Sequence, residues 1–131
     1  MAARDSDYAA FAWFPGVAAL DEWLLLYRRA ARANGGEPDA GRRLLSWARA
    51  AGFTDVTPSA STWCFATPEA TRWWGDMWAE RIVSSDLARQ LMGSGLATDG
   101  DLHRIRAGWR AWASSADAWF AVLHGEVICR P

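Results

Sequence analysis

The sequence predicts a helix-rich α/β domain that is only part of a larger sheet fold. Its clearest strand covers residues 118–129, in which Ala118 to Leu123 form a continuous apolar run. Such a run is typical of a strand buried on both faces of a sheet. The only other good strand covers residues 53–65, and a ribbon of two strands cannot bury a strand in this way. We therefore expect a C-terminal part of an α/β domain without its sheet core.

The remaining strand signals fit this expectation. Pro58 lies inside the strand predicted at residues 53–65, and proline favours an edge strand because it cannot donate a hydrogen bond to a neighbour. Residues 2–8 have the character of a strand end that runs into a loop. The sequence thus predicts one central strand, one edge strand and the end of a third.

Two helices are predicted before the edge strand. Residues 17–33 carry apolar side chains at a helical period and end at Asn34-Gly35-Gly36, a typical C-terminal signal. A second helix is expected to open at Pro38-Asp39, with Asp39 as its N-cap, and to end at Gly52.

A block of helices is predicted between the last two strands. Thr67-Pro68-Glu69 has the pattern of a helix start, and that helix should reach about Val83. Ser85 or Asp86 can cap a short helix, and Thr98 with Asp101 indicates a capping box for a longer one. We interpret 1–131 as a single partial domain and 67–116 as a helical insertion that forms a substrate lid.

Composition excludes several classes of protein. The net charge of −1 argues against a nucleic-acid or anionic-membrane surface, and the sequence contains no signal-peptide core. Cys64 and Cys129 lack metal-ligand spacing, so reduced, buried thiols in a cytoplasmic protein are expected. The ten tryptophans indicate either core packing or an aromatic-walled pocket or covered surface.

A few polar residues are candidates for function. Asp5 and Asp7 follow a strand end, where α/β proteins bind ligands, and they could hold a metal, orient a substrate, act as a base or form a solvated turn. His124 in the last strand fits a structural role better than a catalytic one. The pair Arg42-Arg43 is expected on the surface, and Gly93-Ser94-Gly95 is interpreted as a helix break.

Taken together, several segments resemble the C-terminal part of class I S-adenosylmethionine-dependent methyltransferases, in particular the type 11 or UbiE-like small-molecule group. The resemblance covers nearly the whole chain, and its motifs are weak singly but fairly specific as a set. The segments that carry it are residues 3–8, 33–44, 51–56, 59–63, 119–120 and 124–126.

The resemblance implies a Rossmann-like fold in which residues 2–5 end strand five, 53–65 form strand six and 119–129 form an antiparallel strand seven between them. It also implies that the glycine-rich cofactor loop and the acidic residue after strand two of that family are absent from this chain. S-adenosylmethionine would serve the complete enzyme, and no cofactor is expected for this chain alone. No metal site is expected. The residues that would bind the substrate are Asp5, Asp7, Tyr8, Trp13, Phe14, Trp74 and Trp78.

The resemblance therefore predicts the substrate side of a small-molecule methyltransferase, inactive alone. The alternative is a non-enzymatic, tryptophan-rich module that binds a partner or associates with itself. The expected partners are a small-molecule substrate and either a missing N-terminal half or a second copy of the chain. Nucleic acid and membranes are not expected.

Overall fold

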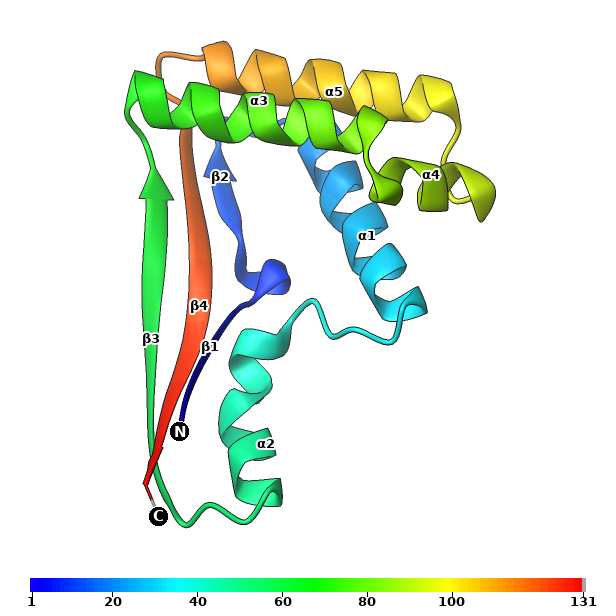
Figure 1. Cartoon of the computed structure of the whole chain (residues 1–131). Coiled ribbons are helices and arrows are strands. Elements are labelled where there is room, and N and C mark those ends of the chain that lie inside the picture. The colour runs from blue at the N-terminus through cyan, green and yellow to red at the C-terminus, as the bar shows by residue number, and fades with distance from the viewer. Residues whose placement is uncertain (131) are drawn as a thin grey trace. The chain divides into compact units, whose positions relative to one another are not determined.

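In the computed structural model, which describes residues 1–130, the chain forms two compact units. We call them the sheet unit and the helical unit. The sheet unit consists of Met1–Ala12, Glu37–Cys64 and the described residues from Ala121 onward, and the helical unit consists of Trp13–Gly36 and Phe65–Phe120. Figure 1 shows the elements of both units.

The last strand, β4 (Trp119–Arg130), is hydrogen-bonded to each of the other described strands, β1 (Ala2–Ser6), β2 (Ala12–Phe14) and β3 (Asp55–Phe65). β1 pairs with β4 in antiparallel register, from Ala2 opposite Ile128 to Ser6 opposite His124. β3 runs along the other side of β4 in the opposite direction to it (Figure 1). The predicted α/β class is confirmed, with an antiparallel sheet. Among the described strands, β3 pairs only with β4, as Pro58 predicts.

The apolar run of β4 is buried from Phe120 to Val122, but not throughout the predicted length. Trp119 is 41% exposed, so the prediction that burial begins at this residue is wrong. It is the first residue of the strand, where few neighbours surround a side chain. Cys129 is buried and Cys64 is exposed, which corrects the expectation that both thiols are buried.

One face of the sheet unit is covered by a short helix, α2 (Leu44–Ala50), which follows a 3₁₀ turn, η2 (Ala40–Arg43). Ala48 packs with Val127 and Cys129 of β4 to form a small apolar core. The prediction that Asp39 caps a helix is wrong, because the 3₁₀ turn follows it and its side chain makes no capping bond. Its carboxylate instead accepts a hydrogen bond from the backbone N–H of Ala9, within the 3₁₀ turn η1 (Tyr8–Ala10).

Two glycines allow η2 to approach β4 closely. A Cβ atom placed on Gly125 would lie 1.9 Å from the carbonyl oxygen of Gly41, and one on Gly41 would lie 2.8 Å from the backbone nitrogen of Gly125. Any larger side chain at either position would therefore force the two segments apart.

The helical unit contains α1 (Ala18–Ala33), α3 (Pro68–Ser84), α4 (Asp86–Gly93) and α5 (Asp99–Ser114). The predicted caps at Thr67 and Thr98 are confirmed, and Thr98 and Asp101 form a reciprocal capping box. Ser85 makes no capping bond to α4. In sequence, α3, α4 and α5 occupy the predicted insertion at residues 67–116, and its role as a substrate lid stays a prediction.

The core of the helical unit is aromatic. The ring of Trp23 meets those of Trp78 and Trp109 edge-on, with centroids 4.6 and 4.8 Å apart, a favourable geometry for indole rings. Glycines let the helices approach one another, since a Cβ on Gly75 of α3 would lie 2.5 Å from that of Ala113. The largest fully buried side chains of this unit are Trp23, Trp78, Trp109, Trp112 and Phe120.

Candidate functional site

The two acids predicted to bind substrate, Asp5 and Asp7, lie at the end of β1, and their surroundings differ. Asp7 is 1% exposed, and its carboxylate accepts hydrogen bonds from Nε and Nη2 of Arg42 at 2.7 and 2.6 Å. The backbone N–H of Arg42 donates a third at 3.0 Å. Asp5 is exposed, and its Oδ1 accepts a hydrogen bond from the backbone N–H of Ser6.

Arg42 lies at the surface, as the sequence predicted, but its guanidinium is also the hydrogen-bonding partner of the buried Asp7. The hydrogen bond to Asp7, together with its negative charge, raises the pKa of the Arg42 guanidinium. The Arg42 side chain remains 55% exposed, so Asp7 fixes the orientation of a cation that still reaches solvent. Beside this pair, the ring of Tyr8 packs against that of Phe11, with centroids 4.4 Å apart.

The other four predicted aromatic residues, which are Trp13, Phe14, Trp74 and Trp78, lie in the helical unit. Trp13 stacks on Phe120 at a centroid distance of 5.6 Å, and Trp74 contacts the same ring at 5.6 Å. Trp78 is 1% exposed and packs in the core, whereas Phe14 is 58% exposed. The structure therefore brings Trp13 and Trp74 to one ring, and the assignment of all four residues to a substrate pocket stays a prediction.

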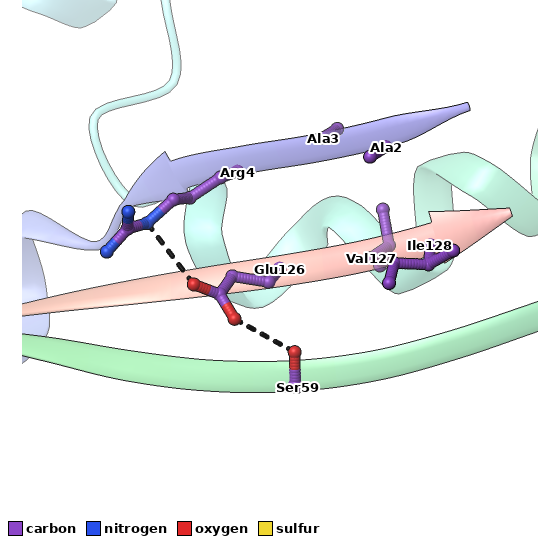
Figure 2. Close-up of a pocket in the computed structure, with 7 residues that line it drawn as sticks. All are labelled: Ala2, Ala3, Arg4, Ser59, Glu126, Val127 and Ile128. Atoms are coloured by element: carbon purple, nitrogen blue, oxygen red, sulfur yellow. Dashed lines mark hydrogen bonds and ion pairs between the residues drawn. The ribbon is translucent and has the colours of Figure 1, made fainter.

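A polar cluster that the sequence did not predict lies on the open face of the sheet unit (Figure 2). Glu126 of β4 accepts hydrogen bonds from the hydroxyls of Ser59 and Ser61 on β3, at 2.9 and 2.6 Å. Nε of Arg4 on β1 lies 3.2 Å from the same carboxylate. The hydrogen bonds from Ser61 and Ser59 lower the pKa of Glu126, and Arg4 lowers it further.

This cluster borders a pocket of about 290 Å³. In Figure 2 the side chains of Arg4, Glu126 and Ser59 meet at one end of the pocket, and alanine, valine and isoleucine side chains lie at the other. Arg4 balances the charge of the Glu126 carboxylate and two serine hydroxyls donate hydrogen bonds to it, so the polar end is internally satisfied. The lining residues are Ala2, Ala3, Arg4, Ser59, Glu126, Val127 and Ile128.

His124 lies on the same face, two residues before Glu126. It is 6% exposed, its ring centroid is 4.4 Å from that of Trp63, and its Nδ1 has no hydrogen-bond partner within residues 1–130. Burial lowers the pKa of His124, and the charge of Arg4 lowers it further. The side chain is therefore neutral near pH 7, as expected of a structural histidine.

The alternation of side chains between the two faces of a strand gives a sequence signal for this cluster. Ser59, Ser61 and Trp63 are two residues apart along β3, as are His124 and Glu126 along β4, so each set points to one face. The pairing of the two strands, which decides that these sets meet, is not visible in either segment alone.

The described residues do not form a cradle for a nucleotide-like cofactor. Such a cradle needs several backbone N–H groups in a glycine-rich turn between a strand and a helix. β1 leads into Asp7 and Tyr8, β3 leads into Ala66 and Thr67, and β2 is followed by the single glycine Gly16. Residues 1–130 also contain no group of three or more metal-ligating side chains.

Within residues 1–130, every helix is too short or too polar to cross a membrane.

Comparison with known proteins gives one informative result. No protein-family model matches the chain. The chain is 31% identical over 109 residues, 79% of its length, to an uncharacterized methyltransferase of Schizosaccharomyces pombe. The match spans 38% of that relative, so the chain corresponds to well under half of its length. This similarity supports a relationship to methyltransferases: the chain is similar, over most of its length, to part of a protein that bears that name.

Proposed function

We propose that this chain is the C-terminal, substrate-side portion of an S-adenosylmethionine-dependent methyltransferase that acts on a small molecule. It lacks the cofactor-binding half and is inactive alone. The observation that carries the proposal is the 31% identity, over most of the chain, to part of a methyltransferase. A match to 38% of that relative is consistent with a fragment of a larger catalytic domain.

The sheet supports the finer assignment to a Rossmann-like class I methyltransferase fold. The order β1–β4–β3, with β4 antiparallel to its neighbours, is the order that the resemblance implies for strands five, seven and six. A central antiparallel last strand is a specific arrangement, because most α/β sheets are built from parallel strands. It therefore supports this fold over a generic α/β domain.

The proposed chemistry is an in-line methyl transfer. S-adenosylmethionine, bound by the other half of the complete enzyme, would supply the methyl group, and the residues of this chain would hold and enclose its acceptor. Such a transfer depends on alignment and on the exclusion of water more than on a strong acid. Trp13 and Trp74, which share contacts with Phe120, suit a dry wall. The other residues proposed to bind substrate are Asp5, Asp7 and Tyr8 in the sheet unit and Phe14 and Trp78 in the helical unit.

The DNA upstream of the Met1 codon tests the proposal directly. An open frame that encodes a strand, a glycine-rich loop and a helix is the expected result. The extended protein should then bind S-adenosylmethionine in calorimetry, and the 131-residue chain should not. A stop codon close upstream, or equal cofactor binding by both proteins, would contradict the assignment to a substrate-side fragment.

A second candidate is a non-enzymatic module that binds a partner or associates with itself. It is favoured by large apolar side chains that face solvent, including Trp63 at 49% and Trp73 at 61% exposure. Size-exclusion chromatography with light scattering separates its two forms. A symmetric dimer supports self-association, and a cooperatively folded monomer supports a binding module.

A further inference from the structure

The first half of α3 presents an aromatic surface that the proposed function does not use. Trp73 is 61% exposed, whereas its neighbour Trp74 is 8% exposed. A pocket of about 340 Å³ opens beside Trp73, within the range of small-molecule sites, which begins at about 300 Å³. It is lined by Phe65, Thr67, Glu69, Ala70 and Trp73.

One of the two rings in this pocket, that of Phe65, is held by the core beneath it. Phe65 lies face to face with the buried Trp74, with a centroid distance of 4.4 Å and an interplanar angle of 11°. The ring of Trp73 is 6.1 Å from that of Phe65 and inclined to it by 27°. Since Phe65 rests on a core residue and Trp73 projects from a regular helix, the aromatic wall is formed before any ligand arrives.

Carboxylates flank this wall. Glu69 precedes Trp73 by four residues and Asp76 follows it by three, so the three side chains share one face of α3. Both acids are exposed, and among residues 1–130 neither takes part in a hydrogen bond or ion pair. Glu69 lies in the first turn of α3, close to the positive end of the helix dipole. The pocket therefore combines ring faces with unpaired negative charge.

We propose that this pocket binds a small organic cation that carries an alkylammonium group. The face of an indole ring attracts such a cation through its quadrupole, and tryptophan is the strongest side chain in this respect. The carboxylates of Glu69 and Asp76 add a charge attraction that a neutral ligand of the same shape does not receive. An anionic ligand is repelled by the same two acids. The proposal rests on described side chains of the helical unit alone and is independent of the methyltransferase assignment.

Nuclear magnetic resonance of the ¹⁵N-labelled chain tests the proposal with two probes, choline and its uncharged isostere 3,3-dimethyl-1-butanol. The indole N–H resonance of Trp73 is assigned by its loss in Trp73→Leu. At constant chloride concentration, choline should shift this resonance saturably. The neutral isostere should bind at least about fivefold more weakly, since it loses both the cation–π and the carboxylate attraction.

Two variants and a matched control complete the test. Glu69→Gln should weaken choline binding at Trp73 by about threefold or more, and Trp73→Leu should abolish the choline-induced shifts of the backbone amides of Glu69 and Ala70. The other indole resonances confirm that each variant is folded. Asp86→Asn removes the same charge from the first turn of α4 and should leave the affinity unchanged. Equal binding of the two probes, no shift at Trp73, or equal effects of Glu69→Gln and Asp86→Asn would overturn the proposal.

Discussion

Asp5 and Asp7 stand two residues apart, yet their surroundings give them different physical roles. Asp5 faces solvent, while Asp7 is enclosed and receives three hydrogen bonds from Arg42, one of them from its backbone. A buried carboxylate is tolerated only where such partners replace its lost hydration. Asp7 therefore joins the end of β1 to η2, thirty-five residues further along the chain.

This difference predicts unequal effects of the same substitution. Asp7→Asn should lower the free energy of unfolding by about 2 kcal/mol, because the amide cannot accept all three hydrogen bonds and the charge attraction is lost. Asp5→Asn should change it little, since the side chain is exposed. Urea denaturation of the two variants measures both values. Equal destabilisation would contradict the role assigned to Asp7.

His124 makes stability depend on pH. Its folded-state pKa is lowered, so the unfolded chain binds the proton more tightly, and protonation favours unfolding. Its contribution to stability should be complete above the unfolded pKa of about 6.5 and decline as the pH falls below that value. Besides burial, the charge of Arg4 lowers the pKa of His124, whereas the charges of Glu126 and Asp5 act in the opposite direction.

Denaturation between about pH 7.5 and about pH 5.5 checks this expectation in wild type, His124→Phe and His103→Gln. The loss of stability over this range should be smaller in His124→Phe. The exposed His103 serves as the control, and its variant should behave like wild type. If the stability of His124→Phe depended on pH as strongly as that of wild type, this histidine would be ruled out as the source of the pH dependence.

Local signals predict the helices well, and the resemblance predicts the order of β1, β4 and β3, but contacts between side chains of distant segments are not predicted. The caps at Thr67 and Thr98 and the end of α1 depend on residues within a few positions of one another, so the sequence reveals them. The Asp7–Arg42 pair and the Glu126 cluster depend on segments far apart in the chain. Asp39 was misassigned because its residue type suits both an N-cap and a loop hydrogen bond, and tertiary contacts decided between them.

The close approach of α3 and α5 at Gly75 gives a further prediction. Gly75→Ala should destabilise the helical unit by about 1–3 kcal/mol, because the new methyl group would overlap Ala113 and separate the helices. Gly100→Ala in the first turn of α5 meets only an ordinary contact and should be neutral or slightly stabilising. Thermal unfolding monitored by circular dichroism compares the pair. A Gly75→Ala protein as stable as wild type would show that the helices can separate without a loss of stability.

Acidic and basic residues are nearly equal in number over the whole molecule, and several of them form ion pairs in the structure. The fourteen basic residues are matched by fifteen acids, and exposed arginines such as Arg104 and Arg130 are paired with acids on neighbouring elements. A chain with a net charge of −1 supplies little of the electrostatic attraction that binding to a phosphate backbone needs.

We therefore expect no measurable binding to a fluorescently labelled DNA duplex at physiological salt, as measured by fluorescence anisotropy. A homeodomain or another basic DNA-binding domain of similar size serves as the positive control. Binding that weakens steeply with added salt would contradict the expectation, because it would reveal phosphate contacts.

The packed indoles of the helical unit also have an optical consequence. Trp23, Trp78 and Trp109 lie edge-on or stacked with centroids 4.6 to 6.1 Å apart, close enough for their electronic transitions to couple. Coupled chromophores absorb circularly polarised light differently from isolated ones and pass excitation rapidly among themselves. The aromatic dichroism and the polarisation of the emitted light should therefore report the integrity of this one unit, with no added label.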